Sequence, residues 1–273
     1  MRHWIINVKF VLSLCLVAST VSGWSAVAQS GPRRPLQLFL LVGQSNMAGR
    51  GVVEPSDRAA HPRVWMLDRA KTWVPAVEPM HFDKPIAGVG PGRAFGIAVA
   101  DADPSIDVGL VPAAVGGSAI TAWEPGAVHE QTGAKPYDDA LGRAREASAA
   151  GTFKAVLWHQ GETDATTKGA PEYERRLLAL IERLRRDLGD PALPVLIGQL
   201  GRFTAGALHP SQVEIDAAHR RVAAAVNNAA FVSSEGLTHK GDGVHFDSLS
   251  ARMLGRRYAE AFLRMNRSRA TPR

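Results

Sequence analysis

Residues 43–49, with the sequence Gly-Gln-Ser-Asn-Met-Ala-Gly, contain the side chain best suited to chemistry in this chain. They directly follow residues 36–42, an apolar run that is typical of a buried β-strand. In α/β proteins, functional side chains gather at the carboxyl ends of the strands, and Ser45 stands at such an end. A serine hydroxyl becomes a nucleophile only beside a base and near donors for a developing oxyanion. The rest of the chain must therefore supply these partners.

Residues 242–247, with the sequence Asp-Gly-Val-His-Phe-Asp, place an acid and a base three positions apart. Within a loop or a single turn, Asp242 can accept a hydrogen bond from the ring of His245. That bond holds the imidazole in one tautomer and leaves its other nitrogen free to take the proton of Ser45. An isolated Asp-x-x-His pair is more often a surface or helix-capping feature, so the pair gains meaning only together with the serine.

Two more polar segments follow strand-like runs. Residues 115–118 (Val-Gly-Gly-Ser) come after the run 108–114, and paired glycines leave backbone N–H groups open to a ligand. Residues 159–164 (His-Gln-Gly-Glu-Thr-Asp) come at the end of the run 155–159. Parallel strands bring their carboxyl ends to one edge of a sheet, and packing alone does not explain four polar segments at such ends. The sequence therefore predicts one site built from all four.

Alternating strand-like runs and helical patterns must position these groups. This alternation predicts an α/β fold with helices on both faces of a five-stranded parallel sheet. The helix over 171–188 is the clearest, because its apolar residues share one face and Pro171 suits its first turn. The expected strands cover residues 36–42, 108–114, 155–159, 195–200 and 230–233. The expected helices cover residues 94–102, 137–150, 171–188, 213–226 and 249–265.

Residues 50–91 interrupt the alternation with a long segment rich in proline and glycine. A short hairpin is expected within it, around residues 64–66 and 72–74. Long ordered connections are often functional, although a plain surface cover is an equally good interpretation of this one.

The first 28 residues predict a secretory signal peptide. Residues 1–9 contain Arg2 and Lys9 but no acidic residue, and a mostly apolar stretch follows over residues 10–23. The small residues of Ala26-Val27-Ala28 then fit the rule for cleavage before Gln29. The apolar stretch is short for a membrane span, so we expect no stable span after cleavage at Ala28 and a secreted or periplasmic protein. The expected organisation is a signal peptide over 1–28, a linker over 29–35, one domain over 36–266 and a basic tail over 267–273.

The composition of the chain excludes several further classes of protein. Cys15 is the only cysteine and lies in the expected signal peptide, so the mature chain would have no disulfide and no thiol nucleophile. The formal charge of +6 becomes +4 without Arg2 and Lys9. The basic residues are scattered and lack the aromatic-interleaved stripe of nucleic-acid-binding proteins, so no nucleic-acid partner is expected. A chain of 273 residues that is 45% hydrophobic can build a full core.

The four polar segments, with Trp158 and Ala165 flanking the third, resemble the sialate O-acetylesterase (carbohydrate esterase family 6) branch of the SGNH hydrolase superfamily. The resemblance covers residues 36–263, and its first and third motifs are the specific ones. It implies a three-layer α/β/α sandwich with a flavodoxin-like sheet. It also implies hydrolysis of O-acetyl esters on carbohydrates, such as acetylated sialic acid or acetylated xylan, through an acyl-enzyme and without a metal or other cofactor.

The resemblance also implies residue roles, carried over by position. Ser45 is the nucleophile, His245 the general base and then acid, and Asp242 the orienting carboxylate. The oxyanion donors are the backbone N–H groups of Ser45 and Gly116 and the side-chain amide of Gln160. The wider superfamily has asparagine at this last position, and glutamine is the usual variant in this branch.

Other residues near these motifs are candidates for supporting or substrate-contacting roles. Glu162 is expected to brace the Gln160 loop, whereas His159 and Arg50 could touch substrate or be satisfied otherwise. A metal site made by the histidines and acids of these segments would leave Ser45 without a purpose. Trp65 and Trp123 could stack on sugar rings or belong to the core. The supporting candidates are Gln44, Asn46, Arg50, Gly117, His159 and Glu162.

Two other functions stay open. A general short-chain carboxylesterase or lipase on the same fold would use the same triad. A non-catalytic carbohydrate-binding domain would not need the complete set of Ser45, Asp242 and His245. An α/β-hydrolase fold is disfavoured, because its Gly-x-Ser-x-Gly motif needs a glycine where this chain has Met47, and because its nucleophile lies later in the sheet.

Overall fold

The five apolar runs form the parallel centre of the β-sheet. In the computed structural model, which describes Met1 and residues 31–203 and 208–270, these strands lie in the order β4-β1-β5-β6-β7. Both faces of the strands are covered, which explains why the runs are continuously apolar rather than alternating. The expected α/β fold with a parallel sheet is confirmed. The strands are β1 (Leu36–Gly43), β4 (Asp107–Pro112), β5 (Gly151–His159), β6 (Val195–Gly198) and β7 (Ala229–Val232).

The expected hairpin is present and extends the same sheet. Strands β2 (Val64–Leu67) and β3 (Trp73–Pro75) pair antiparallel, and β2 also pairs in parallel with β4. Within the described residues the sheet therefore has seven strands, in the order β3-β2-β4-β1-β5-β6-β7, instead of the five expected. The hairpin was foreseeable from local patterns, but its attachment to the free edge of β4 depends on a long-range pairing.

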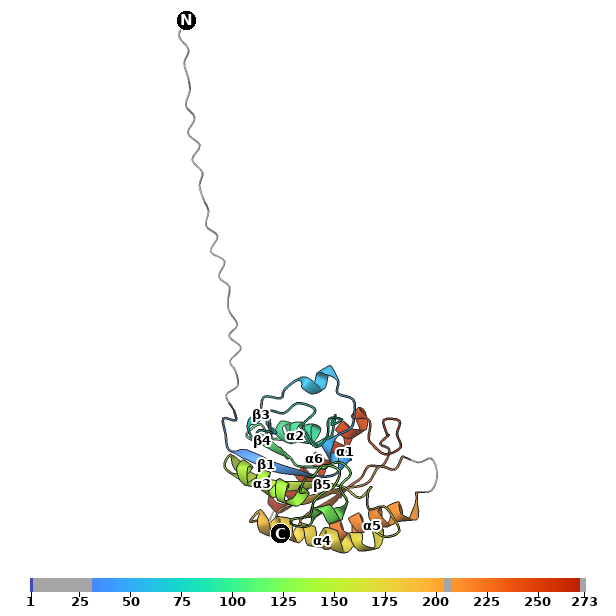
Figure 1. Ribbon diagram of the computed structural model, residues 1–273. Helices are drawn as coiled ribbons and strands as arrows, with labels where there is room; N and C mark the ends of the chain where they lie inside the picture. The colour runs from blue at the N-terminus through green and yellow to red at the C-terminus, as the bar shows by residue number, and fades with distance from the viewer. Residues whose placement is uncertain (2–30, 204–207, 271–273) are drawn as a thin grey trace. The chain divides into compact units, whose positions relative to one another are not determined.

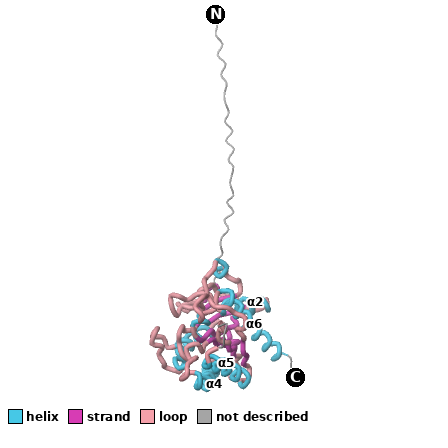
Figure 2. Tube along the Cα trace, turned by 90° about the vertical axis from the view of Figure 1, so that its right-hand side faces the viewer, coloured by secondary structure: helices cyan, strands magenta, loops and turns pink. Residues whose placement is uncertain are grey.

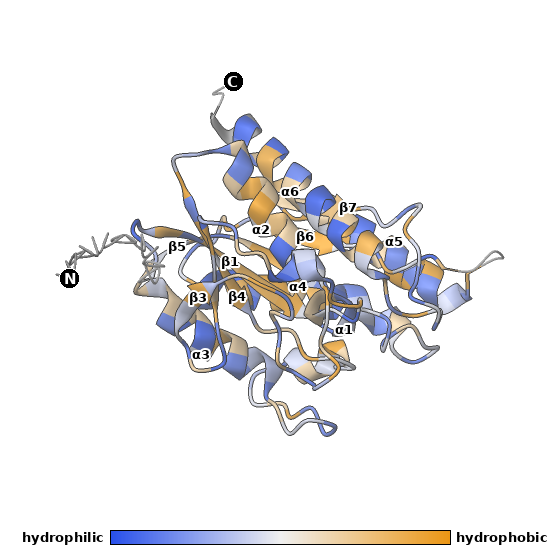
Figure 3. Cartoon of the chain, turned by 90° about the horizontal axis from the view of Figure 1, so that it is seen from above, coloured by the Kyte–Doolittle hydropathy of each residue, from blue (hydrophilic) through white to orange (hydrophobic). Residues whose placement is uncertain are grey.

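Helices cover the two faces of the sheet and create two cores (Figure 1). Helices α2 and α6 pack together on one face, and α3, α4 and α5 cover the other. Figure 2 shows the strands enclosed between these helices, and Figure 3 shows the sheet as an apolar layer with polar residues on the outer helix surfaces. The helices are α2 (Pro91–Ala102), α3 (Pro136–Ser148), α4 (Ala170–Asp187), α5 (Pro210–Ala225) and α6 (Ser248–Ala270).

Short helical turns and one extension complete the chain. The turns are α1 (Ser45–Ala48), η1 (Pro55–Arg58) and η2 (Ile120–Trp123). Helix α6 continues to Ala270, into the expected basic tail. The expected signal peptide, apart from Met1, and its cleavage site lie outside the described residues. Among the helices that the structure describes, none has the length and apolar character required to cross a bilayer.

The strand order places a topological switch point beside β1. From β1 the chain builds β2, β3 and β4 on one side, and it then crosses to build β5, β6 and β7 on the other. In open parallel sheets the connections leave such a point in opposite directions, which opens a crevice at the carboxyl ends of the strands. The segment that carries Ser45 starts at this point.

Candidate active site

Ser45 projects from a tight turn at the end of β1. Gly43 adopts φ +127°, and a side-chain carbon at this position would overlap the carbonyl oxygen of His159 on β5. Only glycine permits this close approach of the two strand ends. The N–H of Gln44 donates to the same carbonyl oxygen at 2.9 Å. Ser45 therefore begins α1 directly beyond the carboxyl end of β1.

Ser45, His245 and Asp242 form a continuous hydrogen-bonded chain. The Oγ of Ser45 lies 3.0 Å from Nε2 of His245, and Nδ1 of His245 lies 2.8 Å from Oδ2 of Asp242. An ionised carboxylate can only accept, so Nδ1 carries the ring proton and Nε2 is free to accept from the serine hydroxyl. The structure thus brings together three side chains that lie up to 200 positions apart.

The loop that carries the acid and the base is organised by its own hydrogen bonds. The backbone N–H groups of Val244 and His245 donate to Oδ1 of Asp242 at 3.0 and 2.8 Å. Burial opposes ionisation of Asp242, but these bonds and the His245 ring together outweigh it and hold the pKa of the carboxyl well below its usual range. His239, which sequence reasoning left without a role, accepts from the N–H groups of Gly241 and Gly243 and so shapes the same loop.

Asn46 fastens this loop to the serine segment. Its Nδ2 donates to the carbonyl oxygen of Val244 at 3.1 Å, and its Oδ1 accepts from the N–H of Phe246 at 3.1 Å. These two backbone groups flank His245 on either side. Asn46 is only 3% exposed, and we therefore regard it as a residue that positions the base.

Glu162 hydrogen-bonds to Asn46, and His159 in turn contacts Glu162. Oε1 of Glu162 accepts from Nδ2 of Asn46 at 2.6 Å and lies 3.6 Å from Nε2 of His159. Burial alone would raise the pKa of Glu162, but the His159 ring and the Asn46 amide lower it below its ordinary value. The bracing role expected for Glu162 thus runs through Asn46. His159 is fully buried and is not among the residues that line the hollow beside Ser45.

Two tyrosines hold the end of β5 from opposite faces of the sheet. On α6, the hydroxyl of Tyr258 donates to the carbonyl oxygen of Trp158 at 2.8 Å and lies 3.3 Å from Nδ1 of His159. On α4, the hydroxyl of Tyr173 donates to the carbonyl oxygen of Gln160 at 2.8 Å. Neither tyrosine belongs to a sequence motif of the site, and only the packing of the helices brings them there.

The side chain of Gln160 is turned into the protein. It is completely buried, and its Nε2 donates to Oε1 of Gln44 and to the carbonyl oxygen of Ser118, both at 3.1 Å. The same nitrogen also donates to Oδ2 of Asp164. This placement contradicts the prediction that the Gln160 amide faces an oxyanion, because its two N–H bonds already meet three acceptors in the interior.

The N–H of Gly116 also has a partner already. It donates to Oδ2 of Asp83 at 2.8 Å, and the same oxygen accepts from Nη2 of Arg50 at 2.7 Å. The prediction of an unoccupied donor at Gly116 does not fit this geometry, because an oxyanion there would have to compete with a buried carboxylate. Asp83 lies in the long segment after β1 and has no motif that could have identified it. Arg50 is buried and ion-paired, so it is not merely solvated.

A hollow of about 330 Å³ opens beside the triad, and we call it the Ser45 hollow. Most of its lining residues are polar, charged or glycine, and two are aliphatic. Arg50, Lys84 and Ile86 come from the segment over 50–91, so this segment forms part of the site. Trp65 and Trp123 are 3% and 0% exposed and belong to the core. The lining residues are Gln44, Ser45, Arg50, Lys84, Ile86, Gly116, Gly117, Glu162, Thr163, Val244 and His245.

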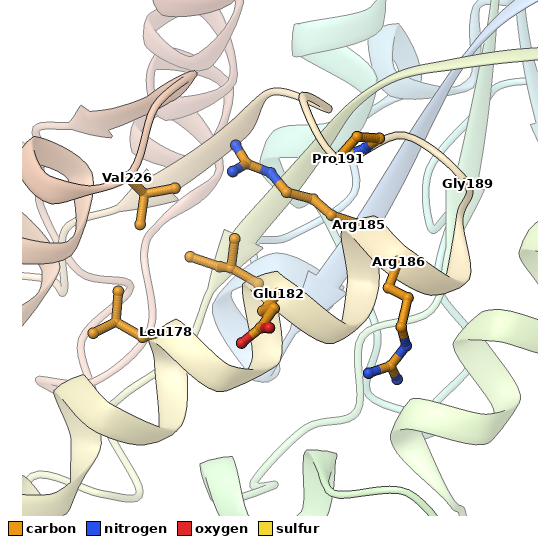
Figure 4. Close-up of a pocket in the computed structure, with 8 residues that line it drawn as sticks. Leu178, Glu182, Arg185, Arg186, Gly189, Pro191 and Val226 are labelled. Atoms are coloured by element: carbon orange, nitrogen blue, oxygen red, sulfur yellow. The ribbon is translucent and has the colours of Figure 1, made fainter.

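A larger groove of about 590 Å³ lies elsewhere, along the last turns of α4 (Figure 4). Leu178, Glu182 and Val226 are among its lining residues. Helix α4 follows the carboxyl end of β5 and runs back along the sheet. The groove at its last turns therefore lies toward the amino ends of the strands, whereas Ser45 lies at their carboxyl ends. Within residues 31–203 and 208–270, no three histidine, cysteine or acidic side chains gather as ligands for a metal ion.

The geometry can be compared with known families. Residues 35–264 match the family model described as carbohydrate esterase, sialic acid-specific acetylesterase. The chain belongs to this family. A probable carbohydrate esterase of Arabidopsis thaliana is 34% identical over 254 residues, which cover 85% of this chain and 92% of the relative. The expected class of enzyme, a carboxylic ester hydrolase acting on carbohydrates, is thereby confirmed.

Solved structures of carbohydrate esterases have the same fold. The crystal structure of the Arabidopsis thaliana protein superposes with a TM-score of 0.74 at 33% identity, over 84% of this chain and 98% of that one. NanS gives a TM-score of 0.71 at 21% identity, over 87% and 99% of the two chains. A carbohydrate acetylesterase from Xanthomonas citri gives 0.67 at 23% identity, over 85% and 57%. At this level of identity, the last two show the fold alone.

Proposed function

We propose that this carbohydrate esterase removes O-acetyl groups from carbohydrates by a serine mechanism in which Ser45, His245 and Asp242 are the catalytic residues. The observation that carries the proposal is the chain of two hydrogen bonds, 3.0 Å from Ser45 to His245 and 2.8 Å from His245 to Asp242. A nucleophile, a base and an orienting carboxylate at these distances are the arrangement that acyl transfer requires.

The reaction proceeds in two halves. In the first, Oγ of Ser45 attacks the acetyl carbonyl carbon while Nε2 of His245 takes the hydroxyl proton. The tetrahedral intermediate then releases the sugar hydroxyl, which receives that proton from His245, and acetyl-Ser45 remains. In the second half, His245 takes a proton from water as the water oxygen attacks the acetyl-enzyme. The second tetrahedral intermediate then releases acetic acid, which ionises to acetate, as His245 returns its proton to Ser45. The ionised Asp242 stabilises the imidazolium in both halves.

The lining of the Ser45 hollow favours a short acyl group on a polar alcohol. Ile86 and Val244 are its only aliphatic side chains, whereas Arg50, Lys84 and Glu162 bring charged groups to its wall. A long acyl chain binds by burying apolar surface, and charged groups next to it would have to be desolvated. The charged side chains beside Ser45 support an acetylated sugar over a long-chain lipid ester as the substrate, and the triad supports an enzyme over a carbohydrate-binding domain.

The experiment is acetate release from a panel of acetylated glycans by the full chain and by Ser45→Ala. We expect the variant to lose on the order of 10⁵- to 10⁶-fold in kcat, because the nucleophile is removed. Ser148→Ala is the matched control, since Ser148 lies exposed on α3 and bonds only within its own helix. Unchanged turnover by Ser45→Ala would refute the mechanism, and a preference for octanoyl over acetyl p-nitrophenyl esters would refute the acetyl specificity.

We also propose that the protein is exported from the cytoplasm. The basic start, the apolar stretch over 10–23 and the Ala26-Val27-Ala28 site support export to the periplasm or the medium. Mass spectrometry of the exported protein is expected to find Gln29 as its first residue.

A further inference from the structure

Ester hydrolysis at Ser45 needs hydrogen-bond donors for the oxyanion, and several donors around the serine already have partners. The N–H of Gly116 donates to Asp83, and Nε2 of Gln160 donates to three acceptors in the interior. The backbone N–H of Ser45, in contrast, donates to no acceptor within the described residues. The side-chain amide nitrogen of Gln44 likewise donates to no acceptor within the described residues.

The carboxamide of Gln44 is held in one orientation. Its Oε1 accepts from Nε2 of Gln160 at 3.1 Å and from the N–H groups of Gly161 and Thr163, both at 3.4 Å. A flipped amide would set its own N–H₂ against three donors, so the oxygen is fixed on this side. Nε2 must then point away from the β5 loop.

This leaves Nε2 of Gln44 on the side of the Ser45 hollow. Gln44 is 3% exposed and lines the hollow together with Ser45. Its Nε2 has no hydrogen-bond acceptor within the described residues, but it does not belong to the polar atoms that are sealed in the interior without a partner. It is therefore an unused donor, next to the nucleophile in sequence and facing the same cavity.

We propose that the side-chain amide of Gln44 donates to the oxyanion, and that Gln160 is a positioning residue that acts by holding Oε1 of Gln44. This inference rests on the proposed function. As the bond from Oγ of Ser45 to the acetyl carbon forms, the electron pair of the carbonyl bond moves to its oxygen. That oxygen then accepts from the N–H of Ser45 and from Nε2 of Gln44. Both donors are in place before the reaction, and one such donor contributes about 10²- to 10³-fold to kcat.

Gln44→Glu separates this role from a structural one. Glutamate keeps oxygens that can accept from Gln160, Gly161 and Thr163, but an ionised carboxylate has no donor. We expect the melting temperature to stay close to that of the parent while kcat falls by about 10²- to 10³-fold and KM changes by less than about threefold. Measurement on the pH plateau of kcat avoids confusion with a displaced titration of His245.

Phenylboronic acid gives a readout that does not depend on turnover. It forms an O–B bond with Oγ of Ser45 as the serine proton passes to His245, and a boron-bound oxygen of the tetrahedral adduct occupies the oxyanion position. Its affinity is expected to fall in parallel with kcat in Gln44→Glu. The neutral variant Gln44→Met, which has neither donor nor acceptor, is expected to show the same losses and thereby excludes an effect of the added charge.

The outcomes that overturn the inference are distinct. If Gln44→Glu keeps kcat and boronate affinity within threefold in an enzyme that Ser45→Ala inactivates, Gln44 is only an acceptor for the β5 loop. If a folded Gln160→Met loses more kcat and more boronate affinity than Gln44→Glu, Gln160 itself is the donor. If Ser45→Ala retains activity, the proposed function fails first.

Discussion

Asn46 and Glu162 are 116 residues apart in the sequence, and a hydrogen bond of 2.6 Å joins Nδ2 of the first to Oε1 of the second. Asn46 in turn bonds the backbone on both sides of His245. The end of β5 is therefore connected through two side chains to the loop that carries the base. This connection fixes the distance between His245 and Ser45, on which the proposed mechanism depends.

Asn46→Ala is expected to lower kcat by about 10²-fold, because it frees the two backbone groups that flank His245 and lets the ring move by about 1 Å. KM should change much less. Asn46→Asp should be at least as damaging, since a carboxylate cannot donate to Glu162. Steady-state kinetics on p-nitrophenyl acetate measures both, with the exposed Asn227→Ala as the control. Wild-type kcat in Asn46→Ala would show that the loop is held by other contacts.

Glu162→Ala should destabilise the protein by about 1–3 kcal/mol, because the amide of Asn46 loses a buried acceptor. Glu162→Gln keeps an acceptor oxygen and should cost less. The pKa of Glu162 lies below its ordinary value of 4.5, so its ionised form stabilises the fold above that pH. This contribution is lost as the pH falls through the lower pKa of the folded state. Urea denaturation at pH 7 and below pH 4 should therefore show a smaller difference between parent and Glu162→Gln at the acidic pH.

Asp242→Asn should reduce kcat by about 10⁴-fold with little change in the fold, because an amide can present its N–H₂ to Nδ1 and favour the wrong tautomer of His245. Lys240 lies 3.6 Å from Asp242 in an exposed pair. Its replacement, Lys240→Met, should change kcat by less than about threefold, since exposed ion pairs contribute little. The ¹⁵N chemical shifts of the His245 ring nitrogens, measured by NMR, would report the tautomer directly. A normal kcat in Asp242→Asn would mean that another group orients the ring.

Glu78 should make the stability of the protein fall as the pH rises from weakly acidic to alkaline values. This carboxyl belongs to the segment over 50–91 and is buried within it, where it accepts from the N–H groups of Met80 and Gly90. Burial raises its pKa to about 8 from an ordinary value of 4.5. Between these values the folded state holds a proton that the unfolded state has released. Stability therefore decreases by up to about 1.4 kcal/mol per pH unit in this interval.

Glu78→Gln removes this titration. The variant should be less stable than the parent at pH 5, because its N–H₂ replaces one of two acceptor oxygens, but its stability should be nearly independent of pH between 5 and 8. Denaturant unfolding at several pH values compares the two slopes. Parallel slopes for parent and variant would assign the pH dependence to other groups.

Local sequence patterns were sufficient to predict the parallel sheet, the five main helices and the segments that meet at the site. Strand runs, helix faces and glycine turns depend on neighbours within a few residues, so the position of Ser45 at the end of β1 could be anticipated. The pair of Asp242 and His245 also follows from local spacing. The four polar segments at strand ends connected this pair to the serine, and the resemblance to a known family then supported the connection.

The tertiary structure decided which groups around Ser45 keep unused hydrogen bonds. Asp83, which engages the N–H of Gly116, lies 33 positions away from it, and Ser118, whose carbonyl oxygen engages the amide of Gln160, lies 42 positions away. The edge pairing of β2 with β4 and the burial of Trp65 and Trp123 also depend on residues that are distant in the sequence. A donor has one direction and a limited number of bonds, and how it uses them depends on contacts that span the whole chain. The motif around Ser45 therefore predicted the reaction, but only the fold shows that Nε2 of Gln160 has acceptors in the interior, whereas Nε2 of Gln44 has none within the described residues.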